Sequence, residues 1–173
     1  MARDFTPVHP ELRQRARTFP RIPFNRWNVR LFQWLTRLQP ESKAPDDIQV
    51  DQLYVHCQDQ KHRIGLRIYR PKAMNPGAPV LLWMHGGGLI IGSPKQNDHP
   101  LFQIVRNTGI VIVSVDYRLA PNHPFPTPLD DCYAALKWVH THAETLGIDP
   151  NRIAIGGESA GGGLAASLVQ LVH

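Results

Sequence analysis

The pentapeptide GESAG at residues 157–161 is the pattern in the chain that most directly indicates chemistry. It follows a short apolar, β-branched run, Ile153–Ile155, and precedes a stretch rich in Ala, Leu and Val. A serine between glycines at a strand-to-helix junction is typical of a nucleophile elbow, in which a sharp turn exposes the hydroxyl. Glycines suit the flanks because a Cβ there would clash with the strained serine backbone. The pattern predicts that Ser159 is a nucleophile for acyl transfer.

A second motif, His85–Gly88 (HGGG), follows the apolar run 79–84. Bare glycines let backbone N–H groups point into a site, where they can stabilise the oxyanion of a tetrahedral intermediate. The N–H of the residue after the nucleophile, here Ala160, completes such a hole. The two motifs, each after a strand and in this order, favour a serine acyl-transfer site. We expect His85 to brace the loop and Glu158 to anchor neighbouring loops by hydrogen bonds.

The sequence shows no general base for Ser159. Where these motifs occur together, the acid and the histidine follow the serine in chain order. Residues 160–173 contain no Asp or Glu, and their one histidine is His173. If this stretch is helical, His173 lies about 21 Å along the axis from Ser159, whereas a base must lie within about 3 Å or one water away. We therefore expect the triad Asp and His to be lacking and turnover to be weak or absent.

Hydrophobic patterning predicts the elements that position these motifs. Alternation over 48–56 and 63–70 predicts a hairpin. Continuous apolar runs are typical of strands buried on both faces of a parallel sheet, and they lie at 79–85, 109–115 and 153–155. Helices are expected at 99–106, 129–141 and 160–172. The order of strands and helices predicts an α/β fold with a doubly wound, mostly parallel sheet.

Residues 1–45 are predicted to form a separate helical cap segment, and residues 46–173 the main domain. Apolar residues at spacings of three and four predict one apolar helix face, expected to pack on the core or at a pocket mouth: Trp27, Leu31, Trp34, Leu35 and Leu38. Residues 1–43 hold nine Lys and Arg against three Asp and Glu, whereas the remainder holds ten against eleven. A solvated basic face is favoured over a membrane-surface or acidic-partner contact.

Charged residues between the motifs are expected to act structurally. Asp116 and Arg118 are predicted to form a buried ion pair that joins a strand to the following loop. Asp130 and Asp131 are expected to favour the positive N-terminal end of the helix that they precede.

The bulk properties favour one globular domain in a reducing compartment. Cys57 and Cys132 make neither a metal-binding spacing nor a disulfide framework. No signal-peptide pattern opens the chain, and no apolar stretch approaches the roughly 20 residues that span a bilayer. We expect a cytoplasmic protein without a cofactor, a metal site, a membrane span or a nucleic-acid partner.

The chain resembles the hormone-sensitive-lipase-like esterases of the α/β-hydrolase superfamily between about residues 50 and 170. The motifs that carry the resemblance are His85–Gly88, Asp116–Pro121, His123–Pro126, Asp130–Asp131, Asp149–Ile153 and Gly156–Gly162. The resemblance implies a fold of the α/β-hydrolase type, C-terminally truncated, with an N-terminal helical cap. It also implies that Ser159 is the nucleophile and that the N–H groups of Gly86, Gly87 and Ala160 form the oxyanion hole.

The resemblance further implies a cofactor-independent carboxylesterase or lipase-like enzyme. Its substrates would be small-molecule esters with short to medium acyl chains, hydrolysed through an acyl-enzyme. The family's C-terminal strands and its triad Asp and His have no counterpart here, so a second chain that completes the sheet is a candidate partner. A non-catalytic small-molecule-binding remnant of the fold is the alternative. A phosphate-binding loop at 156–163 is disfavoured because the P-loop pattern is missing and Glu158 would repel phosphate.

Overall fold

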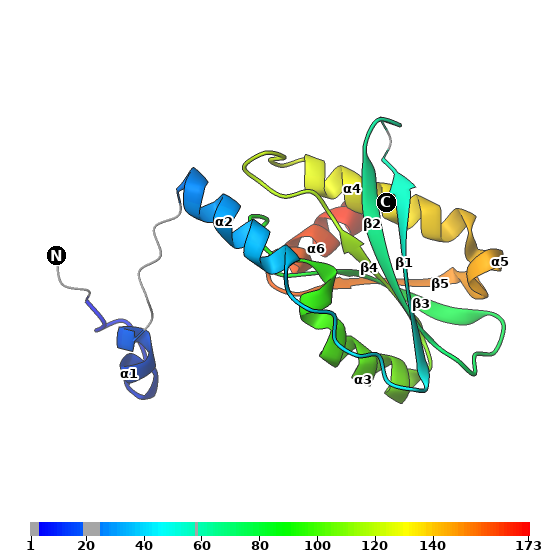
Figure 1. The fold of residues 1–173 in the computed structure, drawn as a ribbon, viewed down its shortest axis with the longest axis horizontal. Helices are drawn as coiled ribbons and strands as arrows, with labels where there is room; N and C mark the ends of the chain where they lie inside the picture. Colours follow the sequence, from blue (N-terminus) through cyan, green and yellow to red (C-terminus); the bar gives the residue numbers. More distant parts are fainter. Residues whose placement is uncertain (1–3, 19–24, 58) are drawn as a thin grey trace.

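A five-stranded mixed sheet forms the centre of the protein (Figure 1). The computed structural model describes residues 4–18, 25–57 and 59–173. The strands lie in the order β1-β2-β4-β3-β5, and their bounds are β1 (Ile48–His56), β2 (Arg63–Pro71), β3 (Ala78–Met84), β4 (Val111–Asp116) and β5 (Ile148–Gly157). β3 pairs in parallel with β4 and β5, whereas β2 is antiparallel to both β1 and β4.

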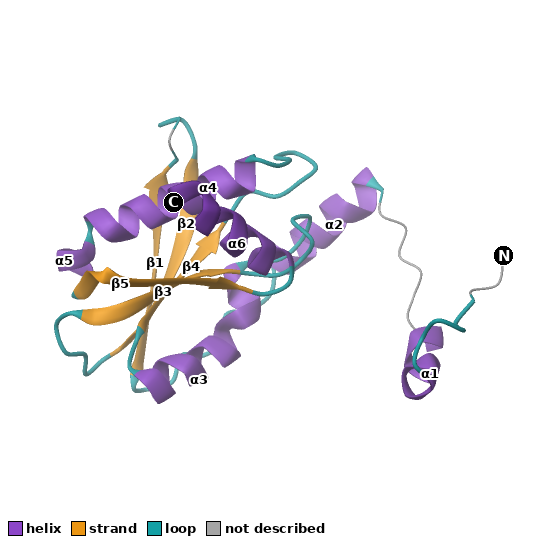
Figure 2. Ribbon diagram, turned by 180° about the vertical axis from the view of Figure 1, so that it is seen from behind, coloured by secondary structure: helices purple, strands orange, loops and turns teal. Residues whose placement is uncertain are grey.

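Helices cover both faces of this sheet, as a doubly wound fold requires. The helices of the described residues are α1 (Pro10–Thr18), α2 (Arg26–Arg37), the 3-10 helix η1 (Pro94–Asn97), α3 (Asp98–Thr108), α4 (Thr127–Thr141), α5 (Ala143–Leu146) and α6 (Ala160–Val172). Figures 1 and 2 show α3 on one face and α4 and α6 on the other. Gly109 ends α3 in the left-handed conformation, at a φ of 71°, which glycine adopts without steric cost.

Two apolar clusters fill the spaces between the sheet and its helices. On the α3 side, Tyr69 and Ile112 pack with the α3 residues Leu101, Phe102 and Val105. The larger cluster joins the opposite face of the sheet to α4 and α6. Strand β4 is buried from Val111 to Val115, because it lies in the middle of the sheet with helices on both sides. This burial explains its continuous apolar sequence.

The predicted hairpin, the three apolar strands and the three helices are all present, with ends shifted by a few residues. β5 is longer than expected and begins at Ile148, because Asp149–Arg152 continues in extended form before the apolar run. The short elements η1 and α5 were not predicted. The division into a cap at 1–45 and a main domain at 46–173 stays a prediction, and residues 1–3 and 19–24 of that cap lie outside the described residues.

The prediction that the apolar face of α2 packs on the core is wrong. Trp27 is 78% exposed, and the other four residues of the face are between 45% and 58% exposed. Of the α2 side chains that the structure describes, Val29 alone is buried. Periodicity identifies residues that share a helix face, but it does not identify what covers that face.

A buried ion pair holds the start of α3 against β2. The Arg67 guanidinium donates to Asp98 through Nε at 2.9 Å and Nη2 at 3.0 Å, and the Tyr69 hydroxyl donates to the same carboxylate at 2.7 Å. Arg67 and Asp98 are only 4% and 1% exposed. Nothing in the sequence pattern predicted this pair, because its members are 31 positions apart.

We predict that Asp98→Ala lowers the free energy of unfolding by about 3–5 kcal/mol, because it removes the buried carboxylate that binds Arg67 and leaves only the exposed Glu41 carboxylate, 3.7 Å away. Asp47→Ala is the matched control. It breaks a pair of similar geometry, in which Arg106 donates to Asp47 at 2.7 and 2.6 Å, but at an exposed position. We expect the control to cost about 1 kcal/mol or less. Urea unfolding measures the free energy of unfolding of both variants. Equal decreases in the two variants would contradict the burial of the Arg67–Asp98 pair.

The β5 side of the sheet is open in the described structure. β5 pairs with β3 only, and Val169, Leu171 and Val172 of the neighbouring α6 are exposed. An unpaired strand edge beside apolar side chains is a template for association.

We therefore predict that the purified chain self-associates, and that Ala154→Lys on the exposed stretch of β5 reduces the association. Size-exclusion chromatography with light scattering measures both species. A monomeric wild-type chain with sharp, cooperative thermal unfolding would show that the open edge is tolerated.

Candidate functional site

Ser159 lies at the turn from β5 into α6, as the sequence predicted. Its φ of 53° and ψ of −118° place this non-glycine residue in a backbone region that L-residues rarely adopt. Such a conformation costs on the order of 1–3 kcal/mol and persists only where the surroundings enforce it. The side chain is exposed to solvent. The predicted strain of the serine backbone is therefore confirmed, whereas its catalytic role stays a prediction.

The surroundings that enforce this turn are backbone atoms at the end of β3. The Glu158 N–H donates to the Met84 carbonyl at 3.1 Å. A Cβ added at Gly157 would lie 2.8 Å from the same oxygen, and a Cβ at Gly161 would overlap the carbonyl oxygens of Met84 and His85. The turn thus packs backbone against backbone, which explains why glycines flank the serine.

The glycine loop lies against the same turn. A Cβ at Gly86 would lie 3.3 Å from the carbonyl oxygen of Glu158, the residue before Ser159. Gly87 has a φ of 126°, and a Cβ there would overlap the Ile91 carbonyl. Both motifs therefore meet at one edge of the sheet.

Several backbone N–H groups at this edge have no protein partner among the described residues. In the part of the chain that the structure describes, the N–H groups of Gly86, Gly87 and Ala160 donate to no protein acceptor. N–H groups without a protein partner are available to a ligand that carries a negative oxygen. Their assignment to an oxyanion hole stays a prediction.

His85 braces the glycine loop rather than serving as a base. Its ring is fully buried, and Nδ1 lies 2.7 Å from the Gly86 carbonyl, so Nδ1 carries the proton. The ring stacks on Tyr117 with centroids 4.2 Å apart, and the Tyr117 hydroxyl donates to the His85 carbonyl at 2.6 Å. Burial lowers the pKa of His85 to about 4. The imidazole is therefore neutral at pH 7 and a weak proton acceptor.

Glu158 anchors the turn to the loop that leads into α3. Asn97 donates from Nδ2 to the Glu158 carboxylate at 2.8 Å, and Trp83 donates from Nε1 to Asn97 at 3.3 Å. Gln96 also donates to the Gly86 carbonyl at 3.3 Å. The structural role expected for Glu158 is confirmed, whereas Asn97 and Gln96 were not predicted because no motif contains them.

Gln33 connects α2 to the loops beside the glycine motif. Its Nε2 donates to the Ile90 carbonyl at 2.7 Å and to the Ala120 carbonyl at 2.8 Å. Ala120 in turn donates its N–H to the Leu89 carbonyl at 2.9 Å. Sequence analysis missed Gln33, because a single glutamine among the other polar residues of α2 gives no pattern.

The predicted ion pair between Asp116 and Arg118 is wrong. Arg118 instead binds Asp131 of α4, from Nη2 at 2.6 Å and from its backbone N–H at 2.9 Å. Asp131 is fully buried and is the fifth residue of α4, so its role is this ion pair rather than a favourable interaction with the helix end. The carboxylate also accepts from Cys57 Sγ at 3.4 Å, and burial raises the pKa of that thiol to about 12.

Within the described ranges, no group of three or more His, Cys, Asp and Glu side chains could hold a metal ion. None of the helices among the described residues is long and apolar enough to cross a bilayer.

Comparisons with known proteins agree with this geometry. A family model described as alpha/beta hydrolase fold matches residues 81–173. "Carboxylesterase NlhH" of Mycobacterium tuberculosis is 44% identical over 110 residues, which cover 64% of this chain and 34% of that protein. "Carboxylic ester hydrolase LipN" of the same species is 39% identical over 134 residues, or 77% of this chain and 35% of that protein.

Two solved esterases resemble the whole arrangement. "Bacterial Heroin Esterase" superposes with a TM-score of 0.76 and 37% identity, covering 95% of this chain and 52% of that one. The carboxylesterase EstE1, cloned from a metagenomic library, gives a TM-score of 0.68 and 41% identity, covering 84% and 48%. The chain spans about a third of the length of these curated relatives and about half of the solved chains.

We predict opposite effects for two identical substitutions on α6. Gly163→Ala adds a methyl group where nothing lies within 4 Å, so helix propensity stabilises the chain by up to about 1 kcal/mol. Gly161→Ala drives the methyl group into the end of β3, and we expect a destabilisation of about 1–3 kcal/mol. Thermal and urea unfolding measure both variants. Stabilisation by both would mean that the turn does not pack against β3.

Proposed function

The chain belongs to the α/β-hydrolase fold family. We propose that it carries the nucleophile and the oxyanion hole of a serine carboxylic ester hydrolase. Its relatives are carboxylesterases, and the sequence resemblance to hormone-sensitive-lipase-like esterases agrees with the matched family model. The observation that carries the proposal is the strained Ser159 backbone, held where Gly86 of the glycine loop contacts the preceding residue.

In the proposed reaction the Ser159 hydroxyl oxygen attacks the carbonyl carbon of an ester. The serine proton passes to a base or to water, the alcohol leaves, and water then hydrolyses the acyl-enzyme. The N–H groups of Gly86, Gly87 and Ala160 stabilise the oxyanion that forms in each step. Their lack of protein acceptors among the described residues supports this role.

The described residues offer Ser159 no suitable base. His85 is buried, neutral and bound to Gly86. His173 follows the end of α6, and a helix of that length separates it from Ser159 by about 20 Å. We propose that the 173-residue chain, which shows neither a triad Asp nor a triad His, turns over esters poorly by itself. A non-catalytic small-molecule-binding role is the alternative.

The remaining assignments are also proposals. Substrates would be small-molecule esters with short to medium acyl chains, handled without a cofactor. A second polypeptide that pairs with the open edge of β5 could supply the base. We also propose a cytoplasmic location, as expected from the sequence.

We predict that the purified chain hydrolyses p-nitrophenyl butyrate only slowly. Removing triad members leaves roughly 10³–10⁴-fold acceleration over water through the oxyanion hole and substrate binding. Because this residual acceleration does not require the serine, Ser159→Ala and the control Ser167→Ala on the same helix should each change it little. A fast, Ser159-dependent rate would show that a base acts from within the chain. A chain that is no faster than the uncatalysed reaction would contradict the proposed oxyanion hole.

A further inference from the structure

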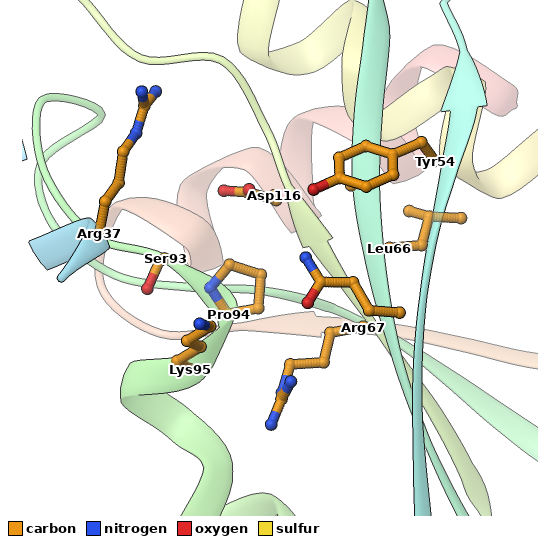
Figure 3. A pocket seen from close by; sticks show the side chains of 10 residues that line it. Arg37, Tyr54, Leu66, Arg67, Ser93, Pro94, Lys95 and Asp116 are labelled. Atoms are coloured by element: carbon orange, nitrogen blue, oxygen red, sulfur yellow. The ribbon is translucent and has the colours of Figure 1, made fainter. Parts of the chain in front are cut away.

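A polar hollow of about 410 Å³ lies between α2, the β1–β2 hairpin and the start of η1 (Figure 3). Seven of its lining side chains are polar or charged: Arg37, Gln52, Tyr54, Arg67, Ser93, Lys95 and Asp116. Neither Ser159 nor the proposed oxyanion-hole residues line it. Its volume lies within the range of about 300–1,000 Å³ that is typical of small-molecule sites.

A glycine makes room for this hollow at the edge of the sheet. Tyr54, Gly65 and Asp116 lie opposite one another on β1, β2 and β4, so they form one row on one face. A Cβ at Gly65 would lie 3.3 Å from the Asp116 Cβ and 3.7 Å from the Tyr54 ring. The missing side chain therefore leaves open the space between the tyrosine and the carboxylate.

Two of the charges around the hollow are already neutralised. Arg67 binds Asp98, and Lys95 Nζ lies 2.9 Å from the Glu41 carboxylate. These ion pairs remove two of the three lining cations as binding groups for an anion. A site for a phosphate or another polyanion would need more unpaired positive charge.

The remaining two charges are opposite in sign and do not touch. Within the described ranges, the side chains of Arg37 and Asp116 make neither a hydrogen bond nor an ion pair. Arg37 comes from α2 and Asp116 from the end of β4, and Figure 3 shows both beside the hollow. Asp116 is an exposed residue, but the protein around it still removes part of the water from its carboxyl and raises its pKa, against the opposing effects of Arg37 and Lys95. An ammonium group would restore the lost stabilisation of this charge.

We propose that the hollow binds a small dipolar molecule that presents a carboxylate to Arg37 and an ammonium group to Asp116. A guanidinium can bind a carboxylate through two parallel hydrogen bonds. Tyr54 and Gln52 add a hydroxyl and an amide beside the polar ends. The ligand class is therefore that of amino acids and longer ω-amino carboxylates. The proposal does not depend on ester hydrolysis, because binding alone is claimed.

Saturation-transfer NMR on the full chain tests the proposal with a series of unbranched ω-amino carboxylates, from glycine to 6-aminohexanoate. We expect one chain length to bind best, because the charge separation of the ligand must match that of the site. Butylamine and butanoate, which carry one charge each, should bind at least about tenfold more weakly, equivalent to about 1.4 kcal/mol.

Asp116→Asn and Arg37→Gln keep the side-chain shape or length and should each abolish the signal of the best probe. Gly65→Ala, which fills the space between Tyr54 and Asp116, should weaken it. Asp46→Asn and Arg30→Gln remove exposed charges elsewhere and should leave binding unchanged.

If no dipolar probe binds better than its singly charged analogues, or if both the Asp116→Asn and the Arg37→Gln variants bind like the wild type, the proposal is wrong.

Discussion

The contact between the β5–α6 turn and the carboxyl end of β3 is the constraint on which the site depends. Gly157 and Gly161 bring the turn onto the carbonyl groups of Met84 and His85 without intervening side chains. The turn can then hold Ser159 in a backbone conformation that would relax elsewhere. Because β3 also leads directly into the glycine loop, one contact fixes both the serine and the donors proposed to face its substrate.

Hydrogen bonds from three other elements, and one from within the loop, hold the glycine loop around this contact. Gln96 reaches it from η1, Tyr117 from the segment after β4, Gln33 from α2, and His85 from within the loop. Most of these bonds end on backbone carbonyl oxygens, which leaves loop N–H groups without protein partners. A loop whose carbonyl groups are bound and whose N–H groups are unbound is prepared for a negatively charged oxygen.

Sequence reasoning recovered the parts of the fold that have strong local signals. The apolar runs located the strands. The glycines at 157, 161, 86 and 87 located the turn and the loop, because close backbone approach leaves few other residues possible there. It failed where a partner lies far away along the chain. Arg118 was paired with Asp116 two positions away, although its partner is Asp131.

The side chains that support the site were missed for the same reason. Asn97 and Gln33 contact groups 61 and 57 positions away, respectively, and only the folded arrangement shows that they are neighbours. The apolar face of α2 was recognised, but the local pattern carries no information about what covers it, and its residues are exposed. Positions where the backbone requires glycine can be predicted from the local sequence, whereas polar contacts between residues far apart in the chain are found only in the structure.

Boron NMR of the chain with butylboronic acid tests the central claim most directly, because a boronic acid mimics the tetrahedral intermediate without requiring turnover. If Ser159 and the surrounding N–H groups are arranged as described, a tetrahedral boronate signal should form with the chain and with Gly163→Ala. The signal should be lost in Ser159→Ala. An unchanged signal in Ser159→Ala, or no tetrahedral boronate with any of the three proteins, would contradict the account.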